Sequence, residues 1–186
     1  MRDKRVRIMV EIALAIALAA VLNMLKIWRM PNAGTVSFAM LPIVVIALRR
    51  GMGIGVLTGA LYGIVDFFID PYPPVHWIQP LLDYPVAYAS VGLAGAFAPA
   101  WRTVADSTAV ARLTTLVAAV ATGAAVRYGV HVISGAIYFG EYAPEGQPVW
   151  VYSALYNLYV PVSAVLVLVA ASVVMPALHK AVPVES

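Results

Sequence analysis

Long apolar runs follow one another along almost the whole chain, and a soluble fold of this size could not bury them all. A helix that crosses a bilayer needs roughly 20 mainly apolar residues. Window hydropathy divides the 186 residues into six such runs, separated by short polar breaks. The six predicted spans are 8–27, 35–48, 52–69, 77–98, 109–139 and 150–178. We therefore expect an all-α polytopic membrane protein, with six transmembrane helices in a single bundle and one domain over residues 1–186.

Basic residues predict the orientation of these helices. If six spans alternate, one side of the membrane carries Arg2, Lys4, Arg5, Arg7, Arg49, Arg50, Arg102, Arg112 and Lys180. The opposite side carries Lys26 and Arg29 together with Asp70, Glu141 and Glu145. Because loops rich in Lys and Arg stay in the cytoplasm, we expect both termini to be cytoplasmic. The net charge of +3 follows from this asymmetry and does not indicate nucleic-acid binding.

Several function classes are excluded by residues that the chain lacks. It contains no cysteine, so disulfides, thiolate metal sites and cysteine nucleophiles are ruled out. It has no GxxxxGK[ST] phosphate loop, so any ATP that drives transport must be hydrolysed by another polypeptide. Neither HExxH nor GxSxG occurs. We expect no enzymatic activity, no cofactor and no metal site.

Function is therefore sought in the few polar groups within the bilayer, where each one is costly. Asp83 lies a short way into the fourth span, near the outer surface. Polar and aromatic candidates in the outer parts of the last two spans are Arg127, His131, Gly135, Phe139, Tyr152, Tyr156 and Asn157. Arg127 and His131 share a helix face because they are four residues apart.

Two interpretations of these groups remain open. In the structural one, Asp83 pairs with Arg127 and only holds two helices together, because intramembrane charges are normally paired. In the functional one, the site binds a small cationic heteroaromatic ligand. Asp83 then offsets the ligand's charge, Asn157 supplies a two-sided hydrogen-bonding edge, and aromatic faces attract the cation. Asp66 is a further buried acid that can cap or pair locally, and we do not assign it to the site.

Aromatic residues are concentrated in the predicted outer loops. They are Trp28, Tyr72, His76, Trp77, Tyr142 and Trp150. An interfacial belt of Trp and Tyr is the ordinary explanation, and we favour it for Trp28 and Trp150 taken singly. As a set over one mouth of the bundle, these rings could also line a site for a flat ligand.

Small residues four apart occur in the first and third spans. Such spacing lets another helix approach closely. For Gly55, Gly59 and Gly63 we expect packing within the monomer. For Ala13 and Ala17, packing within the bundle and contact with an external partner are equally good interpretations.

Motifs in this order and spacing resemble the thiamine-specific substrate-binding (S) components of energy-coupling factor transporters, over nearly the whole chain. The matching pieces are Glu11-Ile-Ala-Leu-Ala, Leu41-Pro…Ala47-Leu-Arg-Arg-Gly51, Asp83-Tyr84, Arg127-Tyr-Gly-Val-His131…Gly135 and Tyr152-Ser…Asn157. The resemblance implies a six-helix protein of the bacterial plasma membrane that captures thiamine at its outer face. It also implies a transmembrane coupling subunit and two ATPase subunits as partners.

The resemblance also implies roles for particular residues. Asp83 would bind thiamine and balance its charge, in a pocket closed by the first outer loop. Other pocket positions would be Tyr84, His131, Gly135, Phe139, Tyr152 and Asn157, with Trp28 and Tyr72 from the outer loops. The ridge of Ala13 and Ala17 would dock on the coupling subunit.

Three positions depart from the family pattern. Asp83 is shorter than the Glu that is typical there, and Phe139 stands where a stacking Trp is expected. Trp28 lies a few residues before the expected first-loop Trp. These changes could retune the pocket toward a precursor such as hydroxymethylpyrimidine, or they could be neutral variation, which we favour because the other pocket positions hold. A stand-alone proton-coupled secondary transporter, with Asp66 or Asp83 as the relay, is the remaining alternative.

Overall fold

The structure, a computed structural model, describes residues 2–31 and 34–182 and is helical over most of that length. Its long helices are α1 (Arg2–Met24), α2 (Met40–Arg50), α3 (Met52–Ile69), α7 (Ala109–Tyr138) and α9 (Tyr159–Ala181). Shorter helical segments are α4 (Gln79–Leu81), η1 (Leu82–Val86), α5 (Ala87–Val91), η2 (Gly92–Phe97), α6 (Ala98–Val104), η3 (Gly140–Tyr142) and α8 (Val149–Tyr156). Strands β1 (Trp28–Arg29) and β2 (Thr35–Val36) form a small antiparallel pair after α1.

Five helical stretches among the described residues are long and apolar enough to cross a membrane. They are Asp3–Met24, Met52–Ile69, Gln79–Val104, Ala109–Tyr138 and Val149–Ala181. The last combines α8 and α9, and Gln79–Val104 combines α4, η1, α5, η2 and α6. The predicted all-α bundle of apolar helices is confirmed.

The second predicted span, 35–48, differs from the structure. Its first residues form β2, and α2 begins only at Met40 and has 11 residues. At about 1.5 Å per residue, α2 is about 16 Å long, roughly half of a bilayer's hydrocarbon core. Thr35 and Val36 are extended because they pair with Arg29 and Trp28, a contact that hydropathy does not register. Asn32 and Ala33, between β1 and β2 in the sequence, lie outside the described residues.

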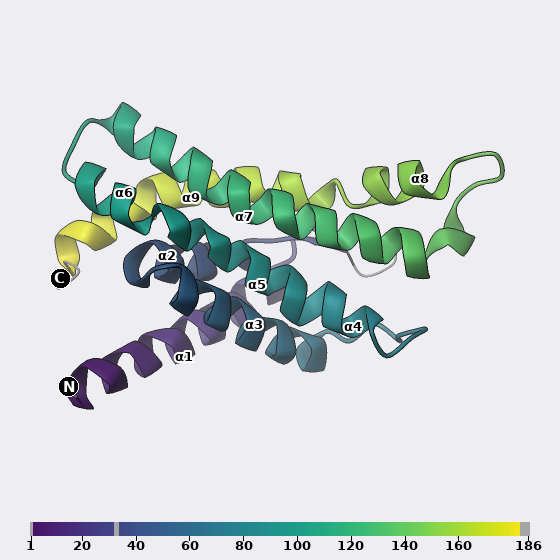
Figure 1. Cartoon of the computed structure of the whole chain (residues 1–186), viewed down its shortest axis with the longest axis horizontal. Helices are drawn as coiled ribbons and strands as arrows, with labels where there is room; N and C mark the ends of the chain where they lie inside the picture. The colour runs from purple at the N-terminus through teal and green to yellow at the C-terminus, as the bar shows by residue number, and fades with distance from the viewer. Residues whose placement is uncertain (1, 32–33, 183–186) are drawn as a thin grey trace.

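The two ends of the bundle differ in what they carry. Both termini lie at one end, and α4, α8 and the turn after α7 lie at the other (Figure 1). Basic side chains tie the terminal end together. Arg49 donates to the carbonyl oxygen of Val182 over 2.9 Å, and two nitrogens of Arg50 bond to Glu11, each over 2.6 Å. This arrangement agrees with the prediction that both termini share one side of the membrane.

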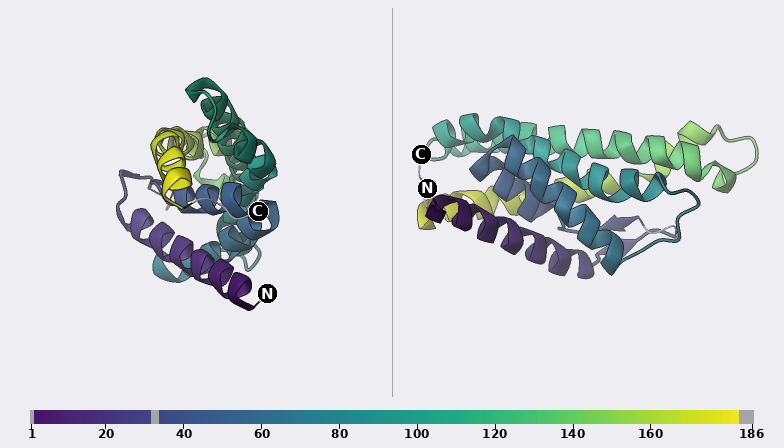
Figure 2. Two further views of the ribbon diagram at one scale, coloured as in Figure 1. Left: turned by 90° about the vertical axis from the view of Figure 1, so that its left-hand side faces the viewer. Right: turned by 60° about the horizontal axis from the view of Figure 1, so that its bottom comes forward.

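Helix α1 lies at the periphery of the bundle (Figure 2). Its outward face is apolar, and Leu14 and Leu18 are 64% and 51% exposed. Ala13 and Ala17 lie on this exposed face, whereas Ala19 is fully buried in the core. The small-residue ridge of α1 is therefore directed away from the other helices of the chain.

The glycines of α3 have the packing role that their spacing predicts. A Cβ atom on Gly63 would lie 2.5 Å from the backbone carbonyl of Tyr84, so only glycine permits this approach. The segment that it approaches is η1, a π-helical turn that contains Pro85. Proline cannot donate a backbone hydrogen bond, and the turn widens there: the N–H of Ala87 bonds to the carbonyl oxygen of Leu82. This wide turn carries Asp83 and Tyr84.

Candidate functional site

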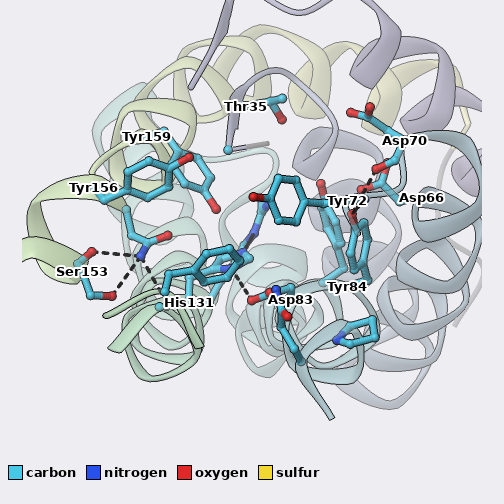
Figure 3. Close-up of a pocket in the computed structure, with 18 of the residues that line it drawn as sticks. Thr35, Asp66, Asp70, Tyr72, Asp83, Tyr84, His131, Ser153, Tyr156 and Tyr159 are labelled. Carbon is cyan, nitrogen blue, oxygen red and sulfur yellow. Dashed lines mark hydrogen bonds and ion pairs between the residues drawn. The ribbon is translucent and has the colours of Figure 1, made fainter. Parts of the chain in front are cut away.

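A pocket opens at the end of the bundle opposite the termini, between the end of α1, β2, α3, α4, η1, α7 and α8 (Figure 3). It encloses about 860 Å³, part of which is open to solvent. Its walls are formed by Asn23, Gly34, Thr35, Asp66, Asp70, Tyr72, Pro74, Gln79, Pro80, Asp83, Tyr84, Tyr88, Arg127, His131, Gly135, Phe139, Tyr152, Ser153, Tyr156, Asn157 and Tyr159. All the pocket positions that the family resemblance implies, except Trp28, belong to this lining. The other outer-loop rings considered as a set, His76, Trp77, Tyr142 and Trp150, do not line it.

Asp83 and His131 meet across the pocket floor. The Nδ1 atom of His131 lies 3.4 Å from Oδ1 of Asp83 (Figure 3). On the other side of the imidazole, Nε of Arg127 lies 3.4 Å from Nε2 of His131. Asp83 thus contacts His131, and Arg127 contacts the far nitrogen of the same ring. Both side chains thus contact His131, whereas the structural interpretation has them paired directly.

Asn157 is held by backbone oxygens where α8 ends. Its amide nitrogen donates to the carbonyl oxygens of Ser153 and His131, over 2.9 and 3.2 Å. Because an amide NH₂ has two protons, these bonds use both of them. The carbonyl oxygen of the side chain remains as the group that can accept a hydrogen bond from a ligand. The structure therefore offers one side of the amide, not the two-sided edge that we predicted.

Gly135 makes this arrangement possible. A Cβ atom there would overlap Oγ of Ser153 and lie 3.2 Å from the amide nitrogen of Asn157. Oγ of Ser153 donates to the carbonyl oxygen of Val132 over 2.8 Å, so α8 packs tightly on α7. Gly135 contributes space for its neighbours.

The wall beside Asp83 is aromatic and is held by one hydroxyl. The hydroxyl of Tyr84 donates to the carbonyl oxygen of Asp70 over 3.0 Å and accepts from the backbone N–H of Tyr72 over 3.1 Å. The ring of Tyr72 then lies 5.7 Å from that of Phe139. Partial burial raises the pKa of Tyr72 above its ordinary value, so its ring stays uncharged.

Tyrosines of α8 and α9 form the opposite wall. The ring centroids of Tyr152 and Tyr156 are 6.1 Å apart, and those of Tyr156 and Tyr159 are 6.3 Å apart. Tyr159 also covers His131, with ring centroids 5.8 Å apart. It packs so closely on Gly34 that a Cβ there would lie 2.6 Å from its ring. Gly34 therefore lets the first outer loop close against this wall.

Trp28 lies outside this lining. It is 65% exposed on β1, opposite Val36. Its neighbours in the first loop reach the pocket rim instead: Lys26 and Arg29 both pair with Asp70, over 2.5 and 3.3 Å. A role for Trp28 at the pocket stays a prediction.

Sequence reasoning did not assign two carboxyl groups that line the pocket, Asp66 and Asp70. Asp66 is 6% exposed and lines the pocket. Its Oδ1 accepts from the amide of Asn23 over 2.7 Å and from the hydroxyl of Tyr62 over 3.0 Å. Asn23 also accepts from Oγ of Ser37 over 3.1 Å. The four-residue spacing of Tyr62 and Asp66 was visible in the sequence, but the contact with α1 was not.

This pocket combines carboxylates, one hydrogen-bond acceptor of fixed direction and many aromatic faces. Those groups suit a flat cation that carries an N–H donor. In residues 2–31 and 34–182, no three His, Cys, Asp or Glu side chains gather in a way that could hold a metal ion.

Three comparisons with known proteins agree with one another. Residues 9–184 match the model of a family described as "Thiamine transporter protein". The chain is 42% identical over 159 residues to the thiamine transporter ThiT of Bacillus subtilis, covering 84% of this chain and 83% of that protein. It is 31% identical over 160 residues to ThiT of Lacticaseibacillus paracasei, covering 84% and 80% of the two chains. The solved structure of ThiT from Listeria monocytogenes superposes with a TM-score of 0.81 over 97% of both chains, at 24% identity, and shares the fold.

Proposed function

This chain belongs to the thiamine transporter protein family, and from that membership we propose that thiamine binds in the pocket around Asp83, His131 and Asn157. The protein is a multi-pass bacterial membrane protein that binds thiamine and serves its uptake, and it is not an enzyme. The observation that carries the proposed site is that Asp83, the Asn157 acceptor and the aromatic walls share one pocket.

Each part of thiamine meets a group suited to it. Asp83 balances the permanent positive charge of the thiazolium ring. The carbonyl oxygen of the Asn157 side chain accepts a hydrogen bond from the aminopyrimidine, whose amino group is a donor. The flat rings pack on the faces of Tyr72, Phe139 and Tyr152, which attract a cation through their quadrupoles.

Other residues act by holding these groups in place. His131 contacts Asp83, Tyr84 holds the turn that carries Tyr72, and Gly135 makes room for Asn157. We keep Trp28 as a residue of the first loop that contacts thiamine once the loop closes over it.

The energy for uptake comes from other subunits in this proposal. The chain has no phosphate loop, and its α1 presents Ala13 and Ala17 on an exposed apolar face. Small residues on a lipid-exposed helix let a partner helix approach closely. We therefore propose that this face docks on the transmembrane coupling subunit of an energy-coupling factor transporter, within the lipid bilayer. Two ATPase subunits complete that transporter.

Calorimetric titration of the purified protein tests the ligand. Thiamine, its phosphate esters and hydroxymethylpyrimidine are each titrated, and we expect the tightest binding for thiamine, which presents both the cation and the aminopyrimidine. Tighter binding of hydroxymethylpyrimidine than of thiamine would assign the pocket to the precursor instead.

Reconstitution tests the partners. In liposomes that contain this protein alone, we expect binding of thiamine without net accumulation. Accumulation driven by a proton gradient, with no ATPase present, would instead identify a stand-alone secondary transporter.

A further inference from the structure

Asp66 and Asp83 both line the pocket, from different helices. Asp66 belongs to α3 and Asp83 to η1 (Figure 3). The donors to Asp66, Asn23 and Tyr62, are neutral groups. They solvate its carboxylate but cannot cancel its charge. Asp66 is therefore a carboxyl group held by neutral donors next to the space in which a ligand sits.

The protonation of His131 follows from its neighbours. Arg127 always carries its proton on Nε, and that N–H is directed at Nε2 of His131. A nitrogen that accepts a hydrogen bond has no proton of its own, so this imidazole is neutral. Its proton lies on Nδ1, which faces Asp83. His131 consequently adds a donor to the pocket and no charge.

Charged groups of both signs line the pocket. Within the described part of the pocket lining, the positive group is Arg127, 5% exposed, with its Cζ 4.1 Å from the ring centroid of Tyr88. The negative groups of the lining are Asp66, Asp70 and Asp83. At the rim, Asp70 pairs with two cations outside the lining, Lys26 and the half-exposed Arg29. Away from this rim cluster, two carboxyl groups, Asp66 and Asp83, therefore lie in the lining with the one guanidinium of Arg127.

We propose that Asp66 is ionised and is a second charge-selecting residue, which acts together with Asp83 to give the inner part of the pocket, away from Asp70 and its two cations, one net negative charge. One carboxylate is offset by Arg127, and the other is left for a ligand that carries a single positive charge. The inference rests on the proposed binding of thiamine, which is a monocation. It adds Asp66 to the site as a residue that acts through its charge and makes no hydrogen bond to the ligand. Removing the charge of Asp66 leaves the shape of the pocket intact and takes away its preference for a cation.

The test compares two ligands of equal shape. One is thiamine, and the other is an analogue whose thiazolium is replaced by a neutral thiophene ring. For Asp66→Asn we expect thiamine to bind at least about ten-fold more weakly, the scale of one charge interaction at an effective dielectric constant near 20. Binding of the neutral analogue should change little. A variant that only loosens the fold would weaken both ligands alike, and that result would overturn the proposal.

A charge swap serves as the matched variant. The double substitution Asn23→Asp with Asp66→Asn keeps an Asp–Asn pair at the same place and returns the carboxylate to the pocket lining. We expect it to restore the wild-type ratio of the two dissociation constants. If Asp66→Asn does not fold, the double variant is measured alone. A double variant that folds but does not have the wild-type ratio of the two dissociation constants contradicts the inference. Failure of the wild-type protein to bind thiamine at all would instead contradict the proposed function.

Discussion

The guanidinium of Arg127 lies over the ring of Tyr88, with its Cζ atom 4.1 Å from the ring centroid. Tyr88 in turn packs edge-on against Tyr62, with ring centroids 4.6 Å apart. A buried guanidinium over an aromatic face gains about 2 kcal/mol when it is desolvated. We expect Tyr88→Leu to lose that interaction, whereas Tyr88→Phe keeps the ring and loses only about 1 kcal/mol with the hydroxyl. Thermal unfolding in detergent measures both, and equal losses would remove the cation–π contact as a source of stability.

Asp83 is expected to dominate the affinity for thiamine. Asp83→Asn removes the carboxylate next to His131 and leaves the ligand's charge unbalanced in a partly buried site. We expect binding to weaken by about 3 kcal/mol or more, the scale for breaking a buried charge pair. Calorimetry gives the change. Asp106→Asn is the control, because Asp106 is an exposed carboxylate that pairs with His179. Unchanged affinity in Asp83→Asn would remove Asp83 from the site.

Gly135→Ala should damage both packing and binding. The new methyl group would overlap Oγ of Ser153 and push against Asn157. We expect a loss of about 1–3 kcal/mol in stability, as for other overpacked sites, with weaker thiamine binding. Gly129→Ala on the same helix is the control, since nothing lies within 4 Å of its Cβ position. There alanine should be neutral or stabilising by up to about 1 kcal/mol. Similar behaviour of the two variants would contradict the close contact.

Tyr84→Phe should loosen the turn from Asp70 to Tyr72. Without the hydroxyl, the N–H of Tyr72 and the carbonyl of Asp70 both lose a partner, at a cost of about 1 kcal/mol. We expect faster hydrogen exchange at the amide of Tyr72 and a shorter lifetime of the thiamine complex. Tyr128→Phe, which removes a hydroxyl bonded to Ala154, should leave exchange at Tyr72 unchanged. Equal protection of that amide in both variants would show that the turn is held by other contacts.

Helix positions were predictable wherever the sequence marks the ends. The prediction of 52–69 coincides with α3 because a glycine precedes it and Asp70-Pro follows it. The prediction of 35–48 was wrong at its start because β2 is held by pairing with β1, a tertiary effect. The last span is interrupted near Asn157, between α8 and α9, although its hydropathy is continuous.

Site residues were predictable where the helix face on which a residue lies and its depth in the membrane are enough to place it. Arg127 and His131 had to share a face, and Asp83 had to lie at a similar depth on a neighbouring span. Asp66 could not be assigned in the same way. Its partner Asn23 is 43 residues away in sequence, and only the packing of α1 on α3 brings them together. The direction of the Asn157 amide likewise depends on carbonyl oxygens that no sequence pattern reveals.

The 30 residues of α7 have a consequence for how the ligand arrives. At about 1.5 Å per residue the helix is about 45 Å long, which exceeds the thickness of a typical bilayer's hydrocarbon core by about 15 Å. If its other end is flush with that interior, its last three turns stand among lipid headgroups and water. The vitamin can then descend from the aqueous phase along polar walls and keep its charge solvated, so its arrival requires no passage through hydrocarbon.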